Sequence, residues 1–113
     1  MKTQPNPTMP KVLFIANAAR WFDRMNGNTY HSVRITRCSD GATIACPFQY
    51  GYGDSYRQTA LEAMGRAGWL PAKYCGTATH GSPAFDYERE NGYPINWNVT
   101  DGLKRECVRN GEA

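Results

Sequence analysis

This 113-residue sequence lacks any hydrophobic run long enough to cross a bilayer, which takes about 20 residues. Its longest apolar stretch, residues 12–16, has only the length of a strand. The opening segment MKTQPNPTMP contains three prolines and no apolar core, which argues against a signal peptide. We therefore expect a cytoplasmic protein that makes no membrane contact.

The sequence also lacks close pairs of metal-binding residues. Its four cysteines lie at positions 38, 46, 75 and 107, without any C-x-x-C or H-x-x-x-H spacing. Zinc is usually held by such pairs, and disulfides are typical of secreted proteins, for which nothing else in the sequence argues. We expect reduced thiols, no bound metal and no cofactor.

Signatures of catalysis are missing as well. No G-x-S-x-G, H-E-x-x-H or Cys–His motif occurs. The glycines of QYGYGDSY lack both the lysine of a phosphate loop and the third glycine of a dinucleotide site. The run Asp86, Glu88 and Glu90 could gather a divalent cation for a nuclease, although a solvated acidic loop is the simpler interpretation. We expect no enzyme activity.

What is present indicates one folded domain. The hydrophobic content of 41% is sufficient for a core, and the length suits a single one. We predict a flexible arm over residues 1–10 and a single α+β domain over 11–113. The net charge is +3, with +4 on residues 1–53 and −1 on the rest. This excess on the strand-rich half suits an anionic partner, but ordinary solvated surface charge is the favoured explanation.

Apolar periodicity predicts a mainly antiparallel sheet of three or four strands. Residues 11–16, 29–38, 42–48 and 93–99 are the expected strands. In the second, His31 belongs to the apolar face and is expected to be a core residue. In the third, Cys46 and Phe48 are expected on one face. Residues 17–25 fit either a short helix or the first strand of a hairpin that turns at Asn26-Gly27, and the hairpin is favoured.

Two helices are predicted around the sheet. The principal one covers about 54–67, with Asp54 as a favourable cap and Gly68 as its left-handed end, and it packs on one sheet face. A short C-terminal helix over 103–109 is expected to bury Leu103 and Cys107. Residues 72–90 contain many glycines, serines and threonines, which favours a long surface loop.

The stretch PFQYGYGDSYR places three tyrosines and two glycines between a predicted strand and a predicted helix. Core packing of the tyrosines around a tight turn would explain it. Aromatic rings beside arginines also hold unpaired bases by stacking and cation–π contact, and the same residue types anchor protein interfaces. The candidate binding residues are Tyr30, Arg34, Tyr50, Tyr52 and Arg57, with Lys104 and Arg105 as phosphate neighbours.

Three segments, NGNTYHSVRI, DGATIACPFQYGYGDSYRQTALEAM and YERENGYPINWNVTDGLKREC, resemble a family of small uncharacterised proteins encoded by bacteriophages and integrated mobile elements. The resemblance implies a phage accessory protein acting in a bacterial host. It implies no catalytic or binding residue, because the family has no established activity.

These observations favour a non-enzymatic module that binds DNA or RNA on the sheet face opposite the principal helix, which we expect to be open. The alternative is a protein that inhibits a host defence complex, of the anti-restriction or anti-CRISPR type, through the same aromatic surface.

Overall fold

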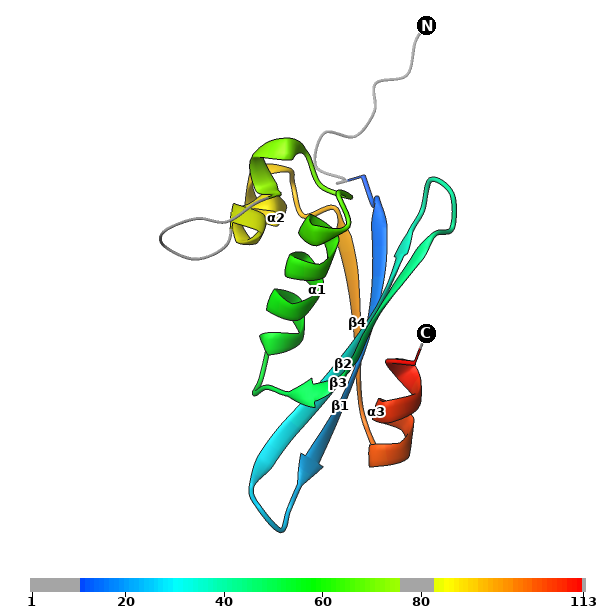
Figure 1. Ribbon diagram of the computed structural model, residues 1–113, viewed down its shortest axis with the longest axis vertical. Helices are drawn as coiled ribbons and strands as arrows, with labels where there is room; N and C mark the ends of the chain where they lie inside the picture. The colour runs from blue at the N-terminus through cyan, green and yellow to red at the C-terminus, as the bar shows by residue number, and fades with distance from the viewer. Residues whose placement is uncertain (1–10, 76–82, 113) are drawn as a thin grey trace, which may run out of the picture.

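The protein has one four-stranded sheet with helices on both faces (Figure 1). The structure is a computed structural model that describes residues 11–75 and 83–112. The strands are β1 (Phe14–Asp23), β2 (Asn28–Arg37), β3 (Thr43–Tyr50) and β4 (Ile95–Asp101), arranged in the order β3-β2-β1-β4. The β1–β2 and β2–β3 pairs are antiparallel, and the edge strand β4 runs parallel to β1. This confirms the predicted α+β class and its mainly antiparallel sheet.

The first strand is longer than the sequence suggested. Residues 14–23 form one continuous strand, so the expected strand over 11–16 and the ambiguous segment 17–25 are parts of one element. Gly27 turns the chain with a φ of 69°, and its N–H donates to the Asp23 carbonyl oxygen at 2.7 Å. The hairpin interpretation of residues 17–25 is therefore confirmed, and the helical one is wrong.

The principal helix α1 (Ser55–Arg66) packs on one face of the sheet and forms the core with it. It ends as predicted: Gly68 has a φ of 74°, and the Trp69 N–H donates to the Met64 carbonyl oxygen at 2.9 Å. Asp54 precedes the helix, but its side chain makes no capping hydrogen bond. The core residues of the sheet and of α1 are Phe14, Ala16, Ala18, Val33, Ile35, Cys46, Ile95, Tyr56, Ala60, Leu61, Ala63 and Met64.

The opposite face of the sheet was predicted to be open, and this is wrong. The short helix α3 (Lys104–Asn110) lies on the centre of that face (Figure 1). Small strand residues leave room for the helix backbone to approach. The Ser32 hydroxyl donates to the Cys107 carbonyl oxygen at 2.5 Å, and the Cys107 thiol donates to the Ala19 carbonyl oxygen at 3.2 Å. The Asn110 amide donates to the carbonyl oxygen of Asn17 at 3.0 Å. Cys107 is buried as predicted, whereas Leu103 is 50% exposed, contrary to prediction.

A β-bulge in β3 changes which side chains reach the second face. His31 pairs with Gln49 and Val33 with Cys46, so two residues of β3, Pro47 and Phe48, lie opposite a single residue of β2. Proline has no N–H to give to a ladder, and a bulge is one of the few places where a sheet accepts it. The extra residue reverses the alternation, so Phe48 lies on the α3 side. The expectation that Phe48 shares a face with Cys46 is wrong for this reason.

Much of the predicted loop over 72–90 is structured. Two 3₁₀ helices, η1 (Ala72–Tyr74) and η2 (Pro83–Asp86), and the helical turn α2 (Tyr87–Glu90) lie beside α1, and Tyr74, Ala84 and Tyr87 are buried. The remaining loop residues 76–82 and the predicted arm 1–10 lie outside the described residues. Within the described ranges, no helix has the length and apolar character needed to cross a membrane.

The bulge and α3 meet at Gly111, which generates a stability prediction. A Cβ atom on Gly111 would lie 2.7 Å from the Cys46 carbonyl oxygen and 2.9 Å from Pro47 Cα. Because both obstacles are backbone, we expect Gly111→Ala to lower the free energy of unfolding by about 1–3 kcal/mol. The matched control is Gly65→Ala inside α1, where the nearest atom would be 3.4 Å away and alanine favours the helix.

Urea denaturation of both variants measures the difference. Equal stability of Gly111→Ala and the unmodified protein would show that α3 is not seated against the bulge.

Candidate functional site

Five aromatic side chains form a continuous row across β1, β2 and β3 on the α3 side of the sheet. Tyr30 stacks on Phe48 with ring centroids 5.0 Å apart and on Trp21 at 5.6 Å. Tyr50 meets Tyr30 edge-on at 5.8 Å, and Tyr52 meets Tyr50 edge-on at 5.2 Å. We call these five residues the aromatic row.

Strand register explains the row. Trp21 and Tyr50 are the two cross-strand partners of Tyr30, and directly opposed residues place their side chains on the same face. Phe48 joins them through the bulge. Tyr50 and Tyr52 are each 53% exposed, and the other three rings are half-buried. A hydrogen bond with Tyr52 raises the pKa of the Tyr50 phenol, so the Tyr50 ring is neutral at physiological pH.

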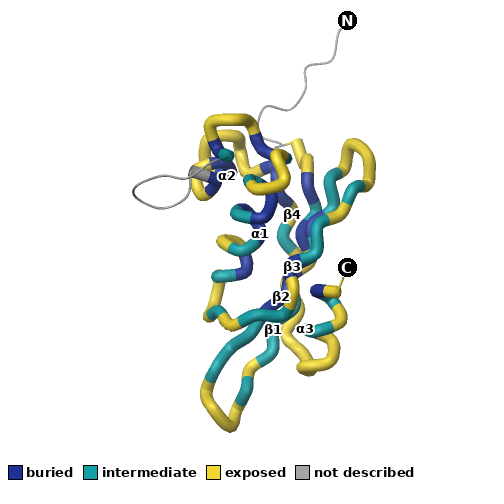
Figure 2. The backbone as a smooth tube through the Cα atoms, viewed as in Figure 1, coloured by how far each residue is buried: buried dark blue, intermediate teal, exposed yellow. Residues whose placement is uncertain are grey.

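Helix α3 brings cations to the row. The Lys104 ammonium lies 5.4 Å from the ring centroid of Trp21 and 5.9 Å from that of Phe48. Arg105 and Arg109 are exposed on the same helix. Ion pairs in the described ranges engage Arg20, Arg37, Lys73 and Arg89, and none engages a cation of α3. Helix α3 therefore brings three exposed cations and one exposed carboxylate, Glu106, to this side of the sheet. Figure 2 shows the exposed stretches of its backbone.

The structure gathers most of the predicted binding residues, with one exception. Tyr30, Tyr50, Tyr52 and Lys104 lie together, and Arg105 follows on α3. Arg34 is also on the α3 side, where its guanidinium donates to the Glu112 carbonyl oxygen. Arg57 is the exception: it lies on α1, on the opposite side of the sheet, with its guanidinium 5.1 Å from the Trp97 ring centroid. The prediction that Arg57 belongs to this surface is wrong.

Two members of the row, Trp21 and Phe48, were not among the predicted site residues. Trp21 falls in the segment whose structure the sequence left ambiguous. As a strand residue, it pairs with Tyr30. Phe48 was expected on the same face as Cys46 because strict alternation was assumed across Pro47. The proline itself was the available signal for a bulge.

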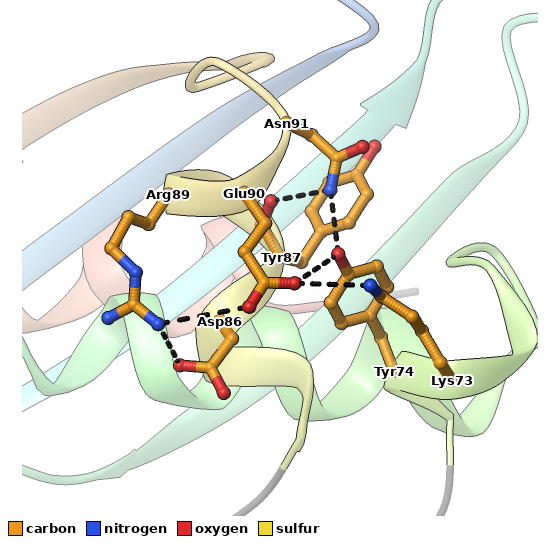
Figure 3. Close-up of polar contacts among 7 residues, drawn as sticks. All are labelled: Lys73, Tyr74, Asp86, Tyr87, Arg89, Glu90 and Asn91. Atoms are coloured by element: carbon orange, nitrogen blue, oxygen red, sulfur yellow. Dashed lines mark hydrogen bonds and ion pairs between the residues drawn. The ribbon is translucent and has the colours of Figure 1, made fainter.

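The acidic residues of the α2 region do not form a common site. Figure 3 shows that Glu90 accepts a hydrogen bond from the Tyr74 hydroxyl at 2.7 Å, while Asp86 pairs with Arg89 at 2.9 Å. Glu88 is buried and accepts a hydrogen bond from the Trp97 indole N–H at 2.7 Å. Glu90 also pairs with Lys73 at 3.4 Å and with Arg89 at 3.9 Å, so every one of these carboxylates is engaged by side chains of the protein. The described part of the chain holds no cluster of three or more potential metal-binding side chains.

His31 is a core residue on the α1 side, as predicted. It is 1% exposed, and its Nε2 shares a hydrogen bond with the Thr59 hydroxyl at 2.8 Å. Its Nδ1 has no hydrogen-bond partner within the described residues and faces Gly51, where a Cβ atom would lie only 2.9 Å away. Burial lowers the pKa of His31, and the Gly51 backbone partly opposes this. The neutral imidazole of His31 therefore packs against the Tyr50-Gly51-Tyr52 turn and supports it.

The cysteines are all free, and they differ in environment. Cys46 and Cys107 are buried, Cys75 is half-buried and Cys38 is exposed. Burial raises the pKa of both the Cys46 and the Cys107 thiols, which makes them poor nucleophiles.

No protein-family model, no curated protein and no solved structure matches the chain. The resemblance to phage-encoded proteins stays a prediction.

The buried neutral His31 predicts a pH dependence of stability. In the unfolded chain histidine titrates near pH 6.5, whereas the folded chain accepts the proton only at lower pH. The unfolded state therefore binds more protons as the pH falls below about 6.5, and stability falls by up to ~1.4 kcal/mol per pH unit across this window. We expect this loss between pH 7.5 and pH 5 in urea denaturation.

His31→Gln, which keeps a polar group near Thr59 and does not titrate, is expected to lose this component while retaining carboxylate titration at lower pH. An equal pH dependence in the variant would assign the effect to other groups.

Proposed function

We propose that this protein binds single-stranded nucleic acid along the aromatic row and α3. The observation that carries the proposal is the contact of Lys104 with the Trp21 and Phe48 rings, because it joins a cationic helix to a line of aromatic side chains. Single-stranded nucleic acid presents the matching pattern of phosphates and unpaired bases. Binding on this surface needs no catalytic group.

The two halves of the surface have different roles in the proposal. Lys104, Arg105 and Arg109 neutralise phosphates, since no carboxylate in the described ranges pairs with them. Tyr50 and Tyr52 offer their exposed rings to bases. A duplex would leave the rings unused because its bases are already stacked on one another. The surface therefore favours single strands over duplexes.

The accompanying proposal of a phage accessory protein in a bacterial cell rests on the resemblance of the three segments quoted above. It fits a small binding module that needs no cofactor, and it leaves the choice between DNA and RNA to experiment.

A second candidate, an inhibitor that binds a host defence protein, is favoured by one observation: Met25 at the hairpin tip is 94% exposed and Phe22 is 54% exposed. Apolar side chains of this kind anchor protein interfaces. Acidic mimicry of nucleic acid by Asp86, Glu88 and Glu90 does not support this candidate, since Glu88 is buried against Trp97. Capture of a host protein that survives nuclease treatment and is lost in Met25→Ser would favour it.

Binding of labelled single-stranded oligonucleotides, followed by fluorescence anisotropy over a series of salt concentrations, tests the proposal. Lys104→Ala/Arg105→Ala is expected to reduce the slope of log K against log salt by about 1.4, at ~0.7 per phosphate contact. Tyr50→Ala/Tyr52→Ala is expected to weaken binding by about 1–3 kcal/mol per stacked base while leaving the slope unchanged.

The matched controls are Arg66→Ala, an exposed cation at the end of α1, and Tyr93→Asn, which replaces a tyrosine that is 59% exposed and has a φ of 57°. Asparagine tolerates that backbone conformation. Neither control should change affinity or slope. Absence of binding to any single strand at low salt would refute the proposal, because phosphate neutralisation is strongest there.

A further inference from the structure

A groove lies at the end of the aromatic row, where the β1–β2 hairpin extends beyond the other strands (Figure 1). Its volume is about 1210 Å³, and it lies between the hairpin and the segment that leads into α3. Trp21, Phe22, Met25 and Leu103 give it apolar walls, and Arg24 and Lys104 are its cations without an ion pair in the described ranges. Trp21 and Lys104 therefore belong to both the row and the groove.

The groove contains an unpaired stretch of strand edge that is one residue long. The Arg20 carbonyl oxygen accepts from the Gly102 N–H at 3.0 Å, so the Arg20 backbone faces β4. Strand backbone groups alternate in direction, and Phe22 therefore points its N–H and C=O the same way. But β4 ends at Asp101, the partner of Arg20, and no described residue bonds to the Phe22 backbone groups.

The polar groups next to the Phe22 backbone already have hydrogen-bond partners. The Asp23 carbonyl oxygen accepts from the Gly27 N–H in the turn, and the Asp23 carboxylate accepts from the Met25 N–H at 3.0 Å. Arg20 is held by Asp101 through two hydrogen bonds of 2.7 and 3.1 Å. The groove thus offers one free backbone donor and one free backbone acceptor between apolar walls.

We propose that this groove holds one unpaired base of the bound strand, with its edge hydrogen-bonded to the backbone of Phe22. This inference rests on the proposed function and extends it by a specific subsite. Each base has donors and acceptors on its edges, which a donor–acceptor pair can satisfy in any nucleotide. The cations Arg24 and Lys104 lie where the phosphates on either side of that base would need neutralisation.

A base fits the groove better than a peptide strand does. Strand addition relies on main-chain hydrogen bonds repeated along several residues, and here the free edge is limited to Phe22. The groove lining carries Arg20, Arg24 and Lys104 against the carboxylates Asp23 and Asp101, and this net positive charge favours an anionic ligand. The continuity of the groove with the aromatic row provides a path for one strand to occupy both.

Phe22→Pro tests the inference, since proline removes the free N–H without removing a bond to β2. Phe22→Ala is its matched control, because it also lacks the ring but keeps the N–H. We expect Phe22→Pro to bind a single-stranded oligonucleotide roughly two- to tenfold more weakly than Phe22→Ala, as loss of one hydrogen bond predicts. Thermal unfolding of both variants verifies that each is folded at the assay temperature.

Photo-crosslinking of the unmodified protein is an independent measurement that does not depend on the folding of a variant. An oligonucleotide with a single 4-thiouridine or 4-thiothymidine, moved along its length, is crosslinked and the protein is digested for mass spectrometry. At one position of the label, we expect attachment within residues 21–25 or at Leu103.

The outcomes separate the two proposals. If single strands bind with the predicted salt dependence, but Phe22→Pro equals Phe22→Ala or all crosslinks fall on Tyr50 and Tyr52, the groove subsite is overturned and the proposed function stands. If single strands do not bind at all, both are overturned.

Discussion

The bulge at Pro47 is the constraint on which the candidate surface depends. Up to Cys46, β3 alternates in step with the core, and Ile44 and Cys46 face α1. The extra residue shifts the next side chains by one position, so Phe48 and then Tyr50 turn to the α3 side. Without the shift, Phe48 would face α1 and the stack against Tyr30 would not exist. A single proline therefore divides β3 into a core-forming part and a surface-forming part.

The second constraint is the place where α3 lies. Ala19 and Ser32 are small, and the helix backbone approaches them closely enough for the Ser32 hydroxyl and the Cys107 thiol to bridge the two layers. Large aromatic residues occupy the same face only at the hairpin end, beyond this seat. The first turn of α3 reaches that end and places Lys104 over the rings. Packing at the centre of the sheet thus determines which groups meet at its edge.

The sequence predicted local elements well because their signals are local. Asn26-Gly27 marked the hairpin, and Gly68 with Trp69 marked the end of α1. The alternation in β2 correctly separated His31 from Tyr30, and the stretch PFQYGYGDSYR pointed to Tyr50 and Tyr52, so three of the row's five members were among the predicted residues.

What could not be predicted depends on relations between distant segments. The charge count assigned the positive excess to residues 1–53, yet the cations beside the row come from α3 near the C-terminus. Nothing in the local sequence places α3 on a particular sheet face, because its seven residues bury mainly Cys107. Likewise, Arg57 is close to Tyr52 in the sequence but not in the fold. The turn at residues 51–54 leads the chain to the opposite side of the sheet, where the Arg57 guanidinium lies over the Trp97 ring.

Two of the cations that lie over aromatic rings, Lys104 on the α3 side and Arg57 on the α1 side, form no ion pair in the described ranges, and only Lys104 lies beside the aromatic row. Arg37 lies over Trp69 but is held by Asp40, and Arg20 lies near Tyr56 but is held by Asp101. Lys104 has no carboxylate within ion-pair distance in the described ranges, although its charge acts on nearby Asp23. Its ammonium shields the Trp21 and Phe48 faces from water in the free protein, at a cation–π energy of about 0.5–1 kcal/mol for an exposed site. Because that contact is weak, in the complex we propose a base would displace the ammonium from the rings, and the flexible side chain would then reach the phosphate of the same nucleotide. Under this proposal, one residue covers the rings when the surface is empty and neutralises the ligand when it is occupied.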